Sequence, residues 1–161
     1  MNKILTGPEF FMRRAVTISG DRMRAGLGGP FGAVVVRDGK ILAEGFNGVT
    51  SGNDPTAHAE VVAIREACRQ LGHFSLAGCE LYSSCEPCPM CLGAIYWARI
   101  DRVYFANTRG DAAAIGFDDD HIYREFAQPI AGRSIPFVHL PIEEARSVFK
   151  EWMDKPDKIP Y

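Results

Sequence analysis

Two short stretches decide the fold and the site of this chain: Pro55-Thr56-Ala57-His58-Ala59-Glu60 and Glu86-Pro87-Cys88-Pro89-Met90-Cys91. One imidazole and two thiolates form a ligand set suited to Zn²⁺, and three protein ligands leave the fourth tetrahedral position open to water, as in a catalytic zinc site. Glu60, two residues after the histidine, adds a carboxylate that can move protons at that water. We therefore predict a catalytic zinc centre with His58, Cys88 and Cys91 as its ligands.

Both stretches are expected to begin helices. Pro87 can occupy a first helical position because no N–H donor is needed there. Cys88 and Cys91 are three residues apart and so lie on the same side of one helical turn. The partial positive charge of a helix N-terminus favours the thiolate form of a cysteine. The local structure therefore favours metal binding at these positions.

Apolar runs and turn-forming residues divide the remaining chain into alternating elements. The expected helices cover residues 8–27, 57–71, 87–97 and 141–153, and the expected strands cover residues 31–36, 41–46, 80–83, 103–106 and 135–140. Asp38-Gly39 predicts a tight hairpin between the first two strands. This alternation predicts one α/β domain over residues 1–161, with a sheet that begins as an antiparallel hairpin and continues through helical crossovers.

Composition excludes several classes of function. The 161 residues suit a single core, and the net charge of −2, without a run of Lys or Arg, makes nucleic acid an unexpected partner. No apolar segment approaches the roughly 18 residues that span a bilayer. The first 14 residues lack the pattern of a signal peptide, so we expect a cytoplasmic protein.

Three of the five cysteines crowd into residues 85–91, which favours metal binding over a disulfide framework. An iron–sulfur run would need a further Cys-Pro shortly after Cys91, and none follows. A structural zinc with Cys85 as the fourth ligand stays open, although it would give Glu60 no role. Cys68 and Cys79 are expected to be small buried apolar residues. The other histidines have no cysteine partners nearby: His73, His121 and His139.

The two stretches match the H-x-E…P-C-x-x-C signature of zinc-dependent nucleobase deaminases. The whole chain further resembles the bacterial guanine deaminases of the cytidine/deoxycytidylate deaminase superfamily. The resemblance rests on residues 28–33, 53–60, 84–98 and 114–119 and on the closing Tyr161. It implies a three-layer cytidine-deaminase-like fold, in which helices flank a mixed five-stranded sheet.

The resemblance also implies a reaction. It is the hydrolytic deamination of guanine to xanthine and ammonia, by attack of zinc-bound hydroxide on C2, with one zinc ion per subunit. This is the chemistry of an aminohydrolase acting on cyclic amidines, and it belongs to purine catabolism. Glu60 would deprotonate the water and deliver protons to the ring nitrogen and the departing amine.

Four substrate contacts follow from the resemblance. Asn47 would hydrogen-bond the purine edge, Phe31 would stack on the bicycle, and Asp119 would accept from the N1–H and 2-amino donors. Tyr161 would complete the pocket, reached by exchange of residues 141–161 between the subunits of a homodimer. From the residues alone, the preferred interpretation is a structural one: Asn47 as a turn residue, Phe31 as a core residue, and Asp118-Asp119 as a helix cap. The resemblance reverses this preference for Asn47 and Asp119.

Two rival functions remain at this point. One is deamination of guanosine, cytosine or tRNA adenosine, which needs the same central motif. A tRNA deaminase should carry basic residues around the site, and the balanced charges of residues 154–158 argue against a tRNA substrate. The other rival is a zinc-stabilised interaction module without activity, against which Glu60 argues.

Overall fold

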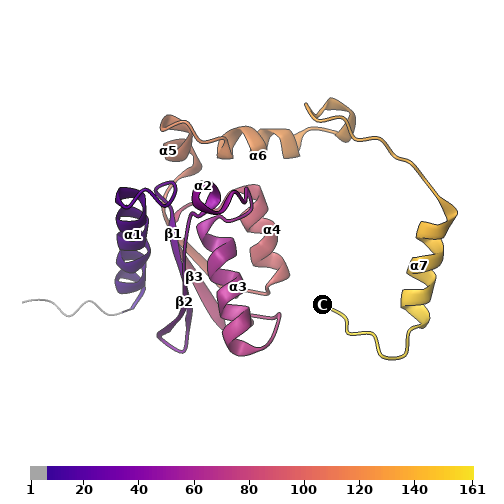
Figure 1. Ribbon diagram of the computed structural model, residues 1–161, viewed down its shortest axis with the longest axis horizontal. Coiled ribbons are helices and arrows are strands. Elements are labelled where there is room, and N and C mark those ends of the chain that lie inside the picture. The colour runs from indigo at the N-terminus through magenta and orange to yellow at the C-terminus, as the bar shows by residue number, and fades with distance from the viewer. Residues whose placement is uncertain (1–6) are drawn as a thin grey trace, which may run out of the picture. The chain divides into compact units, whose positions relative to one another are not determined.

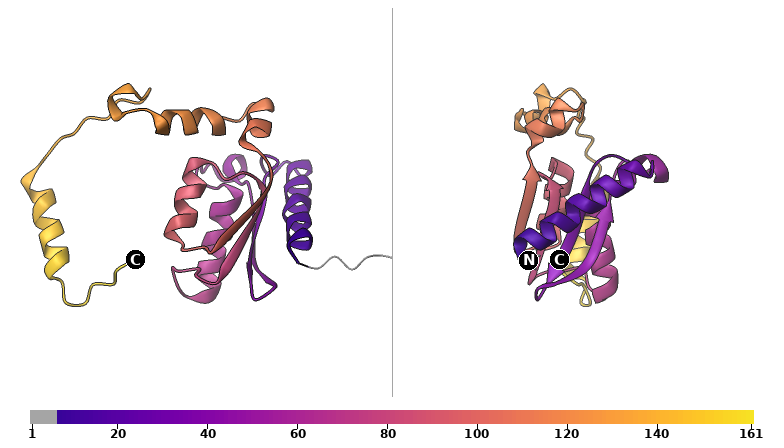
Figure 2. Two further views of the ribbon diagram at one scale, coloured as in Figure 1. Left: turned by 180° about the vertical axis from the view of Figure 1, so that it is seen from behind. Right: turned by 90° about the vertical axis from the view of Figure 1, so that its left-hand side faces the viewer.

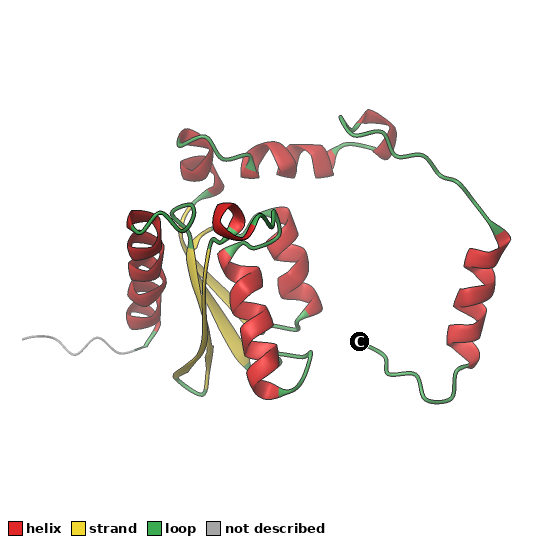
Figure 3. Ribbon diagram, viewed as in Figure 1, coloured by secondary structure: helices red, strands yellow, loops and turns green. Residues whose placement is uncertain are grey.

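The computed structural model describes residues 7–161. The contacts divide the chain into two compact units, one that ends at Tyr123 and one that comprises Arg124–Tyr161, so each unit is described by itself. Figures 1 and 3 show the elements, which are α1 (Pro8–Arg24), β1 (Gly32–Arg37), β2 (Lys40–Phe46), α2 (Val49–Gly52), α3 (Ala59–Leu71), β3 (Cys79–Cys85), α4 (Pro89–Trp97), β4 (Arg102–Asn107), α5 (Arg109–Ala114), α6 (Asp119–Ala127), the 3-10 turn η1 (Ile130–Gly132) and α7 (Glu143–Asp154).

The sheet of the first unit is mixed, with the strand order β2-β1-β3-β4. β1 pairs antiparallel with both β2 and β3, whereas β3 pairs parallel with β4. Asp38 and Gly39 both have positive φ values, 51° and 70°, which the tight turn between β1 and β2 requires. The predicted hairpin and the predicted crossovers are therefore both confirmed.

Helices cover both faces of this sheet, with α1 on one face and α3 and α4 on the other (Figures 1 and 2). Val34 and Val36 pack in the cluster that contains Phe11 of α1. Val35 points the other way and packs in the cluster that contains Ile64 of α3. Because both faces are covered, β1 is a continuous apolar run rather than an alternating one.

The first turn of α3 lies directly on β2, and a glycine makes this approach possible. A Cβ atom on Gly45 would lie 2.1 Å from the carbonyl oxygen of Ala59 and 2.6 Å from the amide nitrogen of Ala63. No side chain fits into that space. The sequence therefore fixes the start of α3, and with it His58 and Glu60, against the sheet.

The second unit contains the end of α6, η1 and α7. Glu125 accepts hydrogen bonds from the amide and the hydroxyl of Ser134, at 2.8 and 2.7 Å. The guanidinium of Arg133 lies over the rings of Phe126 and Phe137, at 5.8 and 5.4 Å from their centroids. These contacts order the turn that follows α6.

The predicted five-stranded sheet is not confirmed, because the described residues form four strands. Residues 135–140, expected as the fifth strand, have no regular structure, and Val138 and Leu140 are 85% and 81% exposed. A strand exists only where a neighbouring strand pairs with it, and the apolar pattern of a segment does not contain that information.

Two element boundaries also differ from prediction. α4 begins at Pro89 rather than Pro87, and Cys88 is its N-cap, with φ −66° and ψ 168°. α1 ends at Arg24 rather than near residue 27, because Gly26 takes a positive φ of 71°. None of the helices within residues 7–161 has the length and apolar character of a membrane-spanning segment.

Candidate active site

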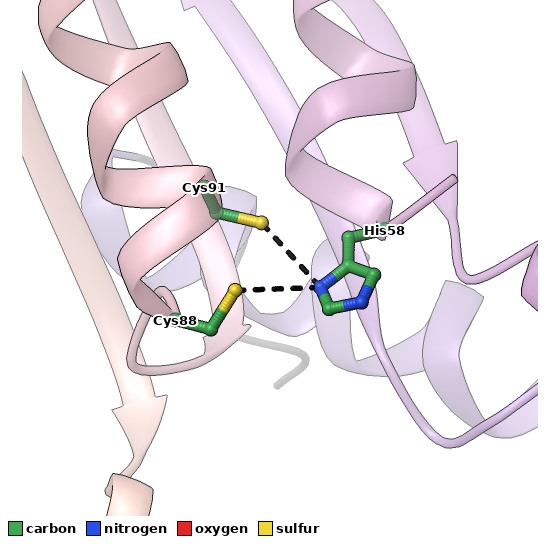
Figure 4. A group of neighbouring side chains, drawn as sticks. All are labelled: His58, Cys88 and Cys91. Atoms are coloured by element: carbon green, nitrogen blue, oxygen red, sulfur yellow. Dashed lines mark hydrogen bonds between the residues drawn. The ribbon is translucent and has the colours of Figure 1, made fainter. Parts of the chain in front are cut away.

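Two helix starts bring His58, Cys88 and Cys91 together (Figure 4). His58 is the N-cap residue of α3, Cys88 is the N-cap residue of α4, and Cys91 lies in the first turn of α4. The Nδ1 atom of His58 lies 3.5 Å from Sγ of Cys88 and 3.6 Å from Sγ of Cys91. One ligand atom from each residue lies within 4.8 Å of the others, which makes this a candidate metal site within the described part of the chain.

The donor set fits zinc. A tetrahedral ion with Zn–N of about 2.0–2.1 Å and Zn–S of about 2.3 Å separates nitrogen from sulfur by about 3.5–3.6 Å. The two measured His58 distances have this value. A hydrogen bond from Cys91, assisted by His58, lowers the pKa of Cys88, which favours the thiolate form that binds metal. These residues can therefore hold a zinc ion.

Cys85 lies outside this group of ligands. Its thiol donates to the carbonyl oxygen of Thr108, with an S···O distance of 3.6 Å. Burial raises the pKa of Cys85 to about 11, which keeps the thiol protonated. A closed site with four protein ligands, the alternative that the sequence left open, is thus not the arrangement that these residues form.

Glu60 lies beside the cluster, in the first turn of α3, and is 6% exposed. Its Oε1 atom accepts a hydrogen bond of 3.0 Å from the hydroxyl of Ser83 on β3. Its Oε2 atom lies 3.4 Å from Sγ of Cys91. Burial raises the pKa of Glu60. One oxygen is thus held by the sheet, while the other faces the ligands.

A cavity of about 300 Å³ opens at the cluster, and most of the side chains that the sequence predicted for the site line it. His58, Glu60, Phe31, Asn47 and Asp119 all line it. Residues far apart in the sequence therefore meet at one cavity. Its volume lies at the lower end of the range for small-molecule sites.

Asn47 is held at the cavity by the backbone around it. Its Oδ1 atom accepts from the amides of Gly29 and Val49, at 3.4 and 3.3 Å, so the amide nitrogen is the group that remains for a ligand. A Cβ atom on Gly28 would lie 1.7 Å from the carbonyl oxygen of Asn47, so this close approach requires glycine.

The segment after β4 also contributes Phe117 and Asp119 to the lining of the cavity. Asp119 is the first residue of α6, and burial raises the pKa of its carboxyl. Phe117 meets Phe31 edge-to-face, with ring centroids 4.7 Å apart and an interplanar angle of 84°. Phe31 therefore forms part of an aromatic corner.

Sequence reasoning assigned no role to Ser83, Phe117 or Tyr123. Ser83 and Phe117 carry the contacts described above. The hydroxyl of Tyr123 donates to the carbonyl oxygen of Pro87, at 2.7 Å. The Gly and Asp residues next to Phe117 could have indicated that its segment belongs to the site. No local sequence pattern indicates a role for Ser83 or Tyr123. Tyr161, the remaining predicted contact, belongs to the second unit.

The fold and this donor set define a zinc-binding deaminase. Residues 6–107 match the family model of the cytidine and deoxycytidylate deaminase zinc-binding region, which covers more than half of the chain, so the protein belongs to that family. A guanine deaminase from Bacillus subtilis is 55% identical to it over 153 residues, which cover 95% of this chain and 98% of the relative. The solved structure of a guanine deaminase from that organism superposes with a TM-score of 0.93 at 54% identity, covering 96% of this chain and 99% of the other.

Two further relatives are less similar to this chain. A tRNA-specific adenosine deaminase from Aquifex aeolicus is 34% identical over 154 residues, covering 92% of this chain and 95% of the relative. A solved guanine deaminase from Nitrosomonas europaea has a TM-score of 0.68 at 35% identity, covering 73% of this chain and 68% of the other. The central motif is therefore shared by enzymes with different substrates, and the substrate must be argued from the rest of the cavity.

Proposed function

We propose that this protein is a zinc-dependent hydrolase that converts guanine and water into xanthine and ammonia, with one zinc ion per subunit. The observation that carries the proposal is the cavity, which the side chains of Asn47 and Asp119 line together with Glu60 and with His58 and Cys88 of the metal cluster. Guanine carries acceptors along one edge and the N1–H and 2-amino donors along another. The 55% identity to the Bacillus subtilis guanine deaminase supports the same substrate.

The ligands and Glu60 divide the chemistry between them. When bound, zinc acidifies water toward neutral pH and so provides a nucleophile. His58, Cys88 and Cys91 would hold the ion. Glu60 would take a proton from the attacking water and pass protons to the ring nitrogen and to the 2-amino group, which leaves C2 as ammonia. The placement of its Oε2 atom toward the ligands supports this role.

The walls of the cavity would orient the base. Asp119 would accept from N1–H and the 2-amino group, and Asn47 would donate through its amide nitrogen to an acceptor of the purine. Phe31, steadied by Phe117, would contact the face of the ring. A site that satisfies both donors and acceptors of guanine leaves buried groups unpaired when another base enters, and this discriminates strongly between bases.

The assay that tests the proposal is ammonia release from the zinc-loaded protein across guanine, guanosine, cytosine, and adenosine within a tRNA stem-loop. Guanine should be the preferred substrate, with xanthine as the product. Preference for the stem-loop would replace the proposal with tRNA deamination, as in the Aquifex aeolicus relative. Ammonia release from none of them would favour a zinc-stabilised interaction module.

We further propose a homodimer in which the single domain is completed by exchange of the C-terminal segment. Apolar residues of that segment, among them Phe137, Val138 and Phe149, are at least 60% exposed in the single chain. β4 is an edge strand, and the groove between it and α1 has a volume of about 650 Å³. Residues 135–140 of a second copy would add the fifth strand there, and residues 141–161 would bring Tyr161 to the partner's cavity.

Exchange is tested by complementation. A chain that lacks its last few residues should keep its zinc but lose most guanine turnover. Mixing it with a Glu60→Gln chain should restore activity, because one site of the heterodimer then has an intact Glu60 and an intact tail. Confirmed heterodimers without activity would assign the tail to its own subunit's site.

We further propose that the enzyme acts in the cytoplasm and in purine catabolism. Its five free cysteines are consistent with a reducing compartment.

A further inference from the structure

The segment that carries Asp119 is only lightly anchored. It follows β4 and comprises α5 and the first half of α6, and most of its side chains are exposed. Ala112 is its buried residue in α5, and α6 has no buried residue. A carboxylate that must meet two donors on a small ring needs to be held within a fraction of an ångström. The contacts that hold this segment therefore determine whether the carboxylate of Asp119 can bind the two donors of the substrate.

Two aromatic side chains anchor the segment on either side of Asp119. Phe117, two residues before it, rests edge-on against Phe31. Tyr123, one helical turn after it, donates its hydroxyl to the carbonyl oxygen of Pro87 at 2.7 Å. Pro87 directly precedes the zinc ligand Cys88. The Tyr123 hydrogen bond thus ties the helix of Asp119 to the loop of the metal cluster.

Arg109 and Glu86 reinforce this tie. The guanidinium of Arg109 lies over the ring of Tyr123, 4.5 Å from its centroid. The backbone amide of Arg109 donates to Oε2 of Glu86 at 2.9 Å, and its guanidinium lies 4.0 Å from Oε1. We call Glu86, Arg109 and Tyr123 the clamp. It joins residues 86–87 to both ends of the segment after β4.

The two sides of the clamp differ in rigidity. Pro87 and Cys88 are buried and lie between β3 and α4, with the amide of Glu86 bonded to Asn107 of β4 at 2.8 Å. The segment that carries Tyr123 is largely exposed. Loss of the hydrogen bond should therefore release the start of α6 and leave the metal loop in place.

We infer that Tyr123 is a positioning residue that sets the place of Asp119 in the cavity, and so controls the binding of the purine's N–H donors. This inference rests on the proposed function, because it concerns how guanine is held. A neutral hydrogen bond of this kind contributes about 0.5–1.5 kcal/mol, which corresponds to roughly a two- to twelvefold change in an equilibrium constant. Tyr123 acts through Asp119 and not on the reacting atoms.

The test compares steady-state kinetics of the zinc-loaded wild type and Tyr123→Phe. The variant should raise the KM for guanine about three- to tenfold, with kcat within about twofold and zinc content unchanged. In an Asp119→Ala background the same substitution should change KM by less than about twofold, since the residue it positions is absent. Arg109→Lys, which loses the planar group over the ring, should raise KM by a smaller factor.

Tyr82→Phe is the matched control. It also removes one tyrosine hydroxyl, which here donates to Glu80 at 2.8 Å, and it should leave KM unchanged. An unchanged KM in Tyr123→Phe, an equal effect in the Asp119→Ala background, or loss of zinc would overturn the inference. Hydrogen exchange gives a readout that does not depend on the substrate: amides 117–123 should exchange faster in Tyr123→Phe, while those of α4 stay protected. If the wild type does not turn over guanine but the two proteins differ in hydrogen exchange in this way, the proposed function is refuted, whereas the role of Tyr123 in holding the start of α6 is retained.

Discussion

Ser83→Ala tests how the chain orients its proton carrier. The Ser83 hydroxyl donates to Oε1 of Glu60 at 3.0 Å, and the two residues are 2% and 6% exposed. Hydrogen bonds to charged groups contribute about 1.5–3 kcal/mol. At 1.36 kcal/mol per tenfold change in rate, full loss of this contact during turnover lowers kcat by about 10- to 150-fold. The KM for guanine and the zinc content should stay near wild-type values, because Ser83 itself neither lines the cavity nor belongs to the metal cluster.

Ser84→Ala is a matched control for the stability of the strand. Its hydroxyl accepts from the amide of Gly32 at 3.0 Å, so the substitution also removes a buried hydrogen bond from β3. It should lower Tm by a similar amount without the loss of kcat. The decisive assay is a double-mutant cycle with Glu60→Gln, in which Ser83→Ala should cost less than about a further twofold. Full kcat in zinc-replete Ser83→Ala, or additive losses in the cycle, would refute the reasoning.

Four other predictions follow from the geometry. Glu60→Gln should keep zinc and the fold but lower kcat by about 10²–10⁴-fold, because an amide cannot carry protons; ammonia release from the metal-replete variant measures this. Cys85→Ser should retain zinc in metal analysis whereas Cys88→Ser loses it, and the reverse result would contradict the three-ligand site. Gly28→Ala should cost about 1–3 kcal/mol of stability and raise KM, because its Cβ would displace Asn47; Gly93→Ala, whose Cβ meets nothing within 4 Å, is the control for both Tm and KM. A hydrogen bond from Arg14 lowers the pKa of Glu44. Their ion pair therefore stabilises the fold above the unfolded-state pKa of about 4.3, and this contribution is lost as the pH falls through the lower pKa of the folded state. Arg14→Met should reduce the free energy of unfolding by about 0.5 kcal/mol at neutral pH, and the difference in Tm from the wild type should vanish in acid.

The metal cluster could be predicted from the sequence because its chemistry is local. His58 and Glu60 share one helical turn, as do Cys88 and Cys91, and only the approach of the two helices had to be supplied by the fold. The hairpin at Asp38-Gly39 was predictable for the same reason, since its backbone needs two positive φ values.

Contacts between distant residues could not be predicted in this way. Ser83 meets Glu60 across 23 residues, and Tyr123 meets Pro87 across 36, without a pattern in the sequence that pairs them. The extents of α5 and α6 were not predicted. α5 is only six residues long and has one buried side chain, whereas α6 is amphipathic but begins at Asp119, which the sequence had offered only as a possible helix cap. The prediction of a fifth strand was not confirmed because a strand needs a neighbouring strand to pair with, and residues 135–140 have no such neighbour in the described chain.

The N-cap positions of α3 and α4 have a consequence for folding. His58 and Cys88 occupy these positions in extended conformations, and neither side chain makes a capping hydrogen bond. A conventional cap would contribute about 1 kcal/mol to each helix. The chain has instead turned both side chains away from their own helices and toward a common point. An ion bound there would act as a shared cap for two helices, so that metal occupancy and the thermal stability of the folded chain rise and fall together.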